Sequence, residues 1–222
     1  DKGGVNMIAF NLSSMHSEAS KKITVNFLID FIYNSISFET SVVSLAAVAR
    51  IINGDSTDIE KNKVTIVNNN LNGFLFMLDL LEKEEAFTEN KLKDLHEIIM
   101  KDLGVGGLYR NVDISVRGSN HTPPSHIKVY DRMKKYFDTI NTPTDNIKEQ
   151  IAFSYLQLMK IHPFLDGNGR CARIVLNYQL LKNNFDPVIL DYNKKDKYFA
   201  CLEEFKVNKN ILPFMDFIDI KG

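Results

Sequence analysis

Cysteine, net charge and long apolar runs are all scarce in this chain of 222 residues. The two cysteines, Cys171 and Cys201, lack the spacing of metal ligands, so we expect free thiols in a reducing compartment. A net charge of −1 provides no electrostatic field for nucleic acid or acidic membranes. No apolar window is long enough to span a bilayer. The composition therefore predicts a cytoplasmic globular protein without membrane or nucleic-acid partners.

The length fits one domain, alone or with a small appendage. The sequence opens at Asp1 without Met and carries no secretory pattern, which indicates an N-terminus trimmed from a longer chain. Apolar residues recur at helical spacing over most of the sequence, and no internal repeat interrupts them. The one stretch with the polar composition of a linker covers 53–70. We therefore expect an N-terminal helical segment over 1–69 and a domain over 70–222.

One segment departs from helical spacing. Apolar and polar residues alternate strictly from 112 to 117, and this period of two predicts a strand whose apolar residues are Val112, Ile114 and Val116. A single hairpin cannot build a sheet core, so we interpret it as an arm lying over another part of the molecule, with an ordinary surface hairpin as the alternative. The predicted fold class is all-α, a helical bundle with one short β-hairpin.

A dense group of chemically capable residues lies between two helical segments, at 162–173. His162 titrates near neutral pH and could accept a proton. Gly167 and Gly169 permit backbone conformations closed to other residues and let amides approach a ligand closely. Amides at the start of a helix are unpaired and, with the helix dipole, form an anion site.

The other polar side chains of this stretch suit a phosphate ligand with a metal ion. Asp166 is a hard oxygen ligand of the kind that Mg²⁺ on a polyphosphate requires. Arg170 and Arg173 lie three residues apart, so both can project from one helical turn, and planar guanidiniums suit phosphate oxygens. Taken together, these groups predict a phosphate-handling site.

Each residue of the stretch also has an ordinary interpretation. A histidine before proline is more often a loop residue, and Gly-Asn-Gly is usually a turn. Arg170 and Arg173 could form a solvated helix face, and Asp166 could be only an N-terminal helix charge. Because one short loop places all of them around one point, the combination favours the functional interpretation.

The stretch from His162 to Arg173 resembles the motif of the Fic-domain family, His-Pro-Phe-x-Asp/Glu-Gly-Asn-Gly-Arg-x-x-Arg, at every specified position. This resemblance implies the Fic fold and transfer of AMP from ATP to a Ser, Thr or Tyr hydroxyl of a target protein or of the protein itself. It implies that His162 deprotonates the hydroxyl, that Asp166 holds Mg²⁺, and that Phe164 anchors the loop. The implied phosphate-binding residues are Gly167, Asn168, Gly169, Arg170 and Arg173.

Two further segments resemble regulatory and target-binding parts of that family. Ser35-x-x-x-Glu39 is similar to the family's inhibitory helix motif, although Thr40 replaces the usual Gly or Asn. The resemblance implies that Glu39 pairs with Arg173 and takes the place of the γ-phosphate, while a charged surface residue near a helix end is the alternative. It also implies that the hairpin over 112–117 clamps the target peptide by strand addition.

Other aromatic and histidine residues carry weaker expectations. The resemblance makes Tyr198 a candidate for the nucleobase pocket, with core packing as the alternative. His96 lies in the apolar stripe of a predicted helix and is expected to be structural. His121 and His126 flank a proline pair without a third ligand, so we expect no metal there.

Two other functions remain open on the sequence. Glu39 could orient a water molecule, so that the same site removes AMP from a modified target. Alternatively, the chain could be a regulatory module that binds a nucleotide without turnover. The presence of both His162 and Asp166 argues against that second alternative.

Overall fold

The computed structural model describes residues 11–39, 43–116 and 119–220. All regular structure within these ranges is helical, which confirms the predicted all-α class. Thr40, where the inhibitory motif is mismatched, lies outside the described residues. The helices of the N-terminal half are α2 (Glu18–Lys21), α3 (Val25–Ser37), α4 (Leu45–Ile52), α5 (Lys61–Glu82) and α6 (Glu89–Met100). Those that follow are η1 (His126–Lys128), α7 (Val129–Ile140), α8 (Ile147–Ile161), α9 (Asn168–Lys182), η2 (Tyr192–Lys194), α10 (Lys195–Asn208) and α11 (Leu212–Phe217).

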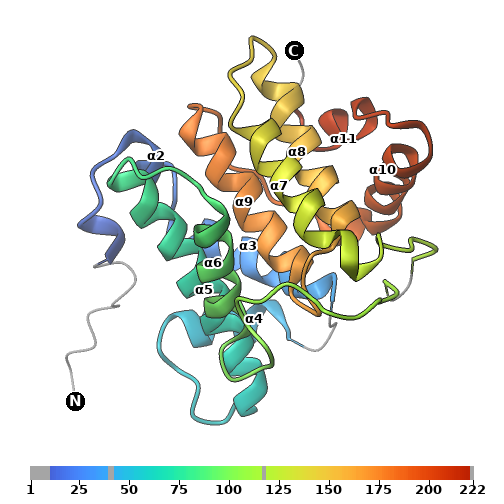
Figure 1. Ribbon diagram of the computed structural model, residues 1–222. Coiled ribbons are helices and arrows are strands. Elements are labelled where there is room, and N and C mark those ends of the chain that lie inside the picture. The colour runs from blue at the N-terminus through green and yellow to red at the C-terminus, as the bar shows by residue number, and fades with distance from the viewer. Residues whose placement is uncertain (1–10, 40–42, 117–118, 221–222) are drawn as a thin grey trace.

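Helix α9 forms the centre of the bundle. It packs against α8 on one side and against α5 and α6 on the other, and it lies between these helices in Figure 1. Nearly every residue of α9 is buried, including the polar residues Asn168, Arg170, Arg173 and Asn177. The N-terminal end of this buried helix carries Arg170 and Arg173, which are 3% exposed each. The fold thus places charged residues inside the core, where they require partners.

Helix α5 begins earlier than the polar composition of 53–70 indicated. It starts at Lys61 and runs without a break through the expected boundary at residue 70. Two of its asparagines, Asn69 and Asn70, lie in the interior, and Asn69 Nδ2 donates to the carbonyl oxygens of Ile99 and Lys101 over 3.1 and 2.7 Å. Asn69 thus ties α5 to the end of α6, and the linker suggested by the polar composition of 53–70 is helical from Lys61 onward.

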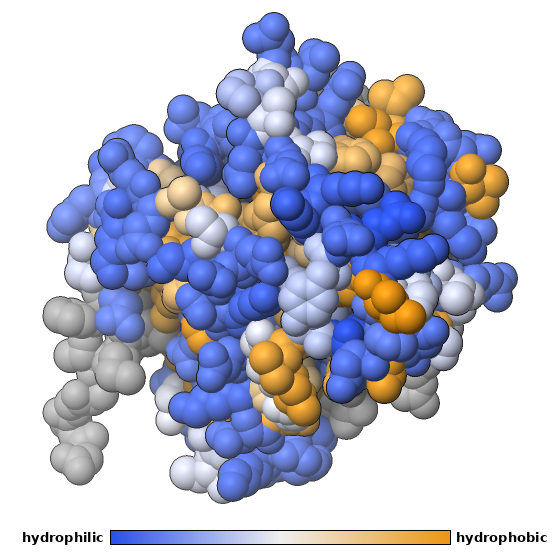
Figure 2. Space-filling model, viewed as in Figure 1, coloured by the Kyte–Doolittle hydropathy of each residue, from blue (hydrophilic) through white to orange (hydrophobic). Residues whose placement is uncertain are grey.

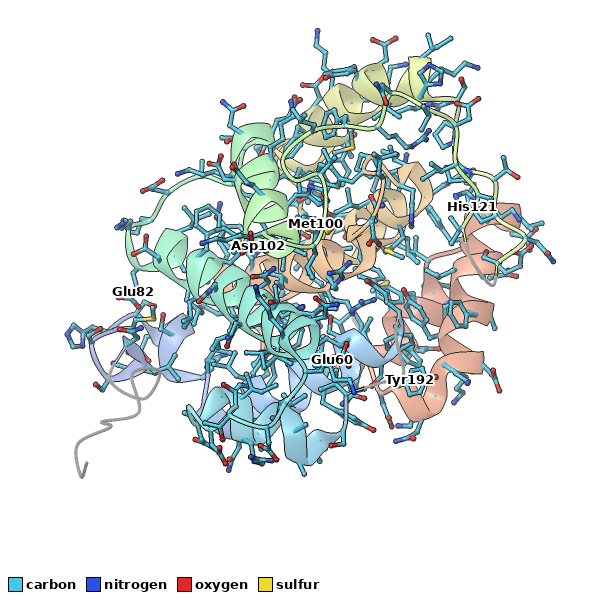
Figure 3. All side chains as sticks on the ribbon, turned by 90° about the horizontal axis from the view of Figure 1, so that it is seen from below. Glu60, Glu82, Met100, Asp102, His121 and Tyr192 are labelled. Carbon is cyan, nitrogen blue, oxygen red and sulfur yellow. The ribbon has the colours of Figure 1, made fainter. Side chains whose placement is uncertain are left out.

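The end of α5 also holds the segment that precedes α3. The carboxylate of Glu82 accepts from the backbone N of His16 over 3.0 Å and from that of Ser17 over 2.8 Å. Figure 3 shows Glu82 beside α2. The N-terminal helices are therefore attached to the same core as the rest of the described chain.

The hairpin expected over 112–117 is not seen, and the described residues contain no strand. Val112 is 48% exposed, whereas Ile114 and Val116 are half-buried. From Asp113 to Val116 the alternation in the sequence corresponds to alternating exposure of an irregular segment, which has no partner strand among the described residues. The backbone N of Ser119 donates to Val116 O over 3.2 Å.

The surface and the thiols agree with the composition. Figure 2 shows a face that is largely hydrophilic, on which apolar residues form small separate groups. Among the described helices, none combines the length and apolar content that crossing a bilayer demands. Cys171 and Cys201 are both buried free thiols, as predicted.

Candidate active site

The loop between α8 and α9 begins at His162, which ends α8 in a left-handed conformation (φ 51°, ψ 62°). A residue other than glycine adopts this conformation at a cost of about 1–3 kcal/mol, so its surroundings must hold it. Arg110 Nε donates to His162 O over 2.9 Å, and its backbone N donates to Pro163 O over 2.9 Å. The buried guanidinium also donates to Val112 O and Pro124 O. Arg110 thus fixes the loop and the segment before η1 to each other.

The imidazole of His162 is oriented by Met159, whose carbonyl oxygen lies 3.1 Å from Nδ1. Because a carbonyl can only accept, Nδ1 carries the proton and Nε2 is left as a proton acceptor. Burial lowers the pKa of His162, and the positive charge of Arg110 acts in the same direction. The ring lines a cavity of about 380 Å³. The site therefore contains a neutral base beside a space for a ligand.

Asp166 lies near the end of the loop with a side chain that is 68% exposed. Its Oδ1 accepts from the backbone N of Gly167 over 2.7 Å, and its Oδ2 lies 3.3 Å from Nη2 of Arg170. No group of three or more His, Cys, Asp or Glu side chains in the described ranges could hold a metal ion. One exposed carboxylate nevertheless fits Mg²⁺, which commonly takes its remaining ligands from water and phosphate oxygens.

The start of α9 is shaped by a glycine and an asparagine. Gly167 has φ +74°, a conformation that favours glycine, and a Cβ there would lie 2.8 Å from Met100 Sδ, which would have to shift. The Asn168 side chain closes the loop, because its Oδ1 accepts from Phe164 N over 2.9 Å and its Nδ2 donates to Phe164 O over 3.0 Å. The amides of Asn168 and Gly169, and not the side chain of Asn168, are left for a ligand, since the amide of Gly167 is bound to Asp166.

A carboxylate occupies this helix start. Glu39 Oε1 accepts from the backbone N of Arg170 over 3.1 Å and from Arg173 Nη2 over 2.9 Å, while Oε2 accepts from Arg170 Nε over 2.5 Å. A Cβ at Gly169 would lie 2.8 Å from Oε1, so the glycine allows this close approach. The start of α9 therefore binds an anion through a backbone amide and two guanidiniums.

The two arginines differ in how completely they are paired. Arg173 Nε donates to Ser35 Oγ and Nη2 to Ser35 O, both over 2.8 Å. Burial acts to lower the pKa of Arg173, but Glu39 and Tyr155 outweigh it and raise the pKa. Arg170 Nη1, in contrast, is buried without a hydrogen-bond partner among the described residues. Because an unpaired buried donor costs about 1–3 kcal/mol, Arg170 retains capacity for a further acceptor such as a phosphate oxygen.

His96 supports the loop from α6. Its Nδ1 accepts from the backbone N of Gly107 over 2.9 Å, so its Nε2 carries the proton and donates to Asp166 O over 2.8 Å. The ring stacks on Phe164 with centroids 3.6 Å apart and planes within 5°. Burial lowers the pKa of His96 to about 4. A neutral His96 thus positions the backbone of the residue that could hold the metal.

Tyr198, the candidate for the nucleobase pocket, is buried in the core, where the alternative of core packing would place it. Tyr198 is 2% exposed, its hydroxyl lies 2.8 Å from that of Tyr155, and its ring packs 4.8 Å from that of Phe38. The cavity beside His162 is lined instead by Phe199. One position along a helix turns the side chain by about 100°, which is enough to move it from the cavity to the core.

Residues 86–180 match the Fic/DOC family. The matched range contains α6 to α8, the whole loop and most of α9. This chain belongs to the Fic/DOC family.

Relatives and solved structures extend this likeness beyond the matched range. The chain is 30% identical over 144 residues to a protein named protein adenylyltransferase Fic from Nematostella vectensis, and 29% identical over 223 residues to one from Culex quinquefasciatus. These alignments cover 63% and 93% of this chain but only 33% and 43% of the relatives. The chain therefore spans less than half the length of these two curated relatives.

Two solved structures share the fold of this Fic/DOC chain. A Fic domain containing signalling protein from Bacteroides thetaiotaomicron gives a TM-score of 0.77 at 20% identity, covering 98% of this chain and 92% of that one. Fic-1 from C. elegans also gives 0.77, at 21% identity, covering 96% of this chain and 66% of the other. At these identities the likeness concerns the fold.

Two residues of this Fic/DOC site had no place in the sequence analysis. Arg110 follows a glycine-rich stretch, and nothing in the local pattern marks a charged residue as buried. Phe199 is adjacent to Tyr198, the residue that the sequence analysis chose, and the two differ only in the side of α10 on which they lie. The role of His96 was foreseen as structural but not as a contact to Asp166, because the two residues are 70 positions apart.

Proposed function

We propose that this Fic/DOC domain is a protein adenylyltransferase, which moves AMP from ATP to a Ser, Thr or Tyr hydroxyl of a target protein or of itself. The observation that carries the proposal is the bound carboxylate of Glu39 at the start of α9, close to a neutral His162. A site that holds one anion through an amide and two guanidiniums suits the phosphates of a nucleotide. The names of the relatives support the choice of AMP as the transferred group.

On this proposal the hydroxyl oxygen attacks the α-phosphorus of ATP and pyrophosphate leaves. His162 Nε2 takes the hydroxyl proton while Met159 O keeps the ring oriented through Nδ1. Arg170, Arg173 and the amides of residues 168–169 stabilise the charge that develops on the phosphates. Mg²⁺ held at Asp166 would neutralise phosphate charge when bound. General-base catalysis of this kind contributes roughly 10²- to 10⁴-fold.

Glu39 would inhibit this reaction. Its carboxylate already satisfies Arg170 N, Arg170 Nε and Arg173 Nη2, which are donors that a phosphate would need. ATP must displace the carboxylate to use them, so the two ligands compete. We further propose that residues 1–69 supply this regulatory segment and that 70–222 carry the catalytic machinery.

Mass spectrometry of the purified chain after incubation with ATP and Mg²⁺ tests the transfer. We expect a mass gain of one AMP on the chain or on an added target protein. His162→Ala should abolish the gain, and Glu39→Gly should increase it. Glu149→Gly is a control, because Glu149 is exposed in the first turn of α8. No transfer with the Glu39→Gly variant across a range of targets would contradict the proposal.

Removal of AMP from a modified target is a second candidate function for the same residues. The carboxylate of Glu39 acts electrostatically on the pKa of His162, and in this second proposal it orients a water molecule for attack on the phosphorus. A target that already carries AMP separates the two reactions. Release that is lost in Glu39→Gly would favour this second function, because the first predicts a gain in that variant.

A further inference from the structure

Four basic side chains converge on a pocket that the proposed transfer does not use. The pocket has a volume of about 600 Å³ and lies between α7, α8, α10 and the segment before η1. Its basic lining residues are His121, Arg132, Lys160 and Lys209. No carboxylate is found among the described residues that line it. A pocket with this lining favours an anion.

The positive charges in this pocket act on one another. The ammonium groups of Lys160 and Lys209 lie 5.7 and 5.8 Å from the centroid of the same Phe205 ring. Burial, together with Lys209 and Arg132, lowers the pKa of Lys160 to about 8. Lys160 and Lys209 each lie at a helix C-terminus, which favours a cation there. This does not account for Lys160, Lys209 and Arg132 lining one pocket in which no described residue carries a negative charge. A bound anion would relieve their repulsion.

The basic pocket adjoins the cavity beside His162. His121 and Lys160 line both spaces, and His121 Nε2 lies 2.8 Å from Lys160 O. Figure 3 shows His121 where the segment before η1 passes α10. Lys160 precedes His162 by two residues. A chain that presents a hydroxyl to His162 could therefore place a nearby side chain among the cations.

We propose that this basic pocket binds an anionic side chain of the acceptor protein, close in sequence to the hydroxyl that is modified. The inference rests on the proposed function for the identity of the molecule that carries the anion. A carboxylate of Asp or Glu and the phosphate of a phosphorylated residue offer the same chemistry to guanidinium and ammonium groups. The preferred acceptor is thus an acidic segment, and the basic pocket favours it over neutral segments.

Fluorescence anisotropy with labelled short peptides tests the site without nucleotide. The peptides share a central threonine and differ in its neighbours, which are glutamates, glutamines or phosphoserines. We expect the glutamate peptide to bind more tightly than the glutamine peptide, with a preference that weakens as salt is added. The phosphoserine peptide distinguishes a phosphate from a carboxylate as the preferred anion.

In a variant with Arg132→Gln and Lys209→Gln, the ratio of affinities for the glutamate and glutamine peptides should fall by roughly three- to tenfold, since each exposed charge pair is worth a few-fold in affinity. Both side chains are exposed, so the fold should tolerate the change. Lys134→Gln with Lys61→Gln removes the same charge from exposed positions outside the pocket and should leave the preference intact.

Equal binding of all peptides, absence of binding, or a preference that survives Arg132→Gln with Lys209→Gln would overturn the inference. AMP transfer to the same peptides is measured separately in the Glu39→Gly background. Selective binding without any transfer would contradict the proposed adenylyl transfer while the anion site stands. Transfer of AMP to all peptides without a charge preference would contradict the anion site and leave the proposed adenylyl transfer standing.

Discussion

Replacing Glu39 by glutamine should destabilise the fold and make its stability depend on an added anion. The side chains of Arg170 and Arg173 are 4% and 3% exposed, and that of Glu39 is 26% exposed. Removing one partner of a buried ion pair costs about 3–5 kcal/mol. Arg173 keeps its two bonds to Ser35, and solvent reaches Glu39, so we expect a smaller loss of about 2 kcal/mol.

For a chain of this size that loss corresponds to a fall in Tm of roughly 4–8 °C. Pyrophosphate should then restore the variant, because a ligand at a hundred times its Kd stabilises the folded state by about 2.7 kcal/mol. The wild-type protein should respond less, since Glu39 already occupies the anion site. Differential scanning fluorimetry with and without pyrophosphate measures both effects.

Glu149→Gln makes the same chemical change at an exposed position and should leave the Tm unchanged with or without pyrophosphate. Two results would refute the reasoning. One is a Glu39→Gln variant whose Tm equals that of the wild type. The other is a wild-type protein that pyrophosphate stabilises as much as it stabilises the variant.

Three other predictions concern the histidines and the cavity. Only neutral His162 accepts a proton, and burial lowers its pKa. In the Glu39→Gly background, kcat/KM should therefore fall as the pH is lowered, with a midpoint below pH 6.5. A midpoint above pH 7 would contradict the assignment of His162 as the base. His96 has a pKa of about 4 in the folded protein and 6.5 in the unfolded chain, so the unfolded chain binds more protons between these pH values. The free energy of unfolding should therefore fall by up to about 3 kcal/mol as the pH drops from 6.5 to 4. His96→Phe should flatten that dependence in denaturant titrations. Phe199→Ala should raise the KM for ATP several-fold while Tyr198→Phe leaves it unchanged, and the opposite result would return Tyr198 to the pocket.

The sequence was most informative where the site is contiguous. Residues 162–173 form one loop and one helix start, so spacing alone brings their functional groups together. Ser35 and Glu39 were found because Ser35-x-x-x-Glu39 resembles a motif of the Fic family, and their contacts to Arg173 follow from where α3 packs. Local periodicity also predicted the helical class correctly, because amphipathic stripes are a property of each segment alone.

The sequence was least informative where distant segments decide the outcome. Arg110 acquires its role from carbonyl groups of His162 and Pro124, and no local pattern announces a buried guanidinium that binds backbone. The alternation around Val112 looked like a strand, but a strand exists only with a partner, and the described residues provide none. The choice between Tyr198 and Phe199 depended on the rotation of one helix against its neighbours.

Arg110 has a mechanical consequence. The guanidinium of Arg110 donates to the carbonyl oxygen of His162 and also to those of Val112 and Pro124 in the segment before η1. If the proposed function holds, a target protein that displaced this segment on docking would also displace the backbone of His162. Binding of a target protein to this segment and alignment of the His162 imidazole would then be coupled, so the imidazole need not be aligned for catalysis before the target binds.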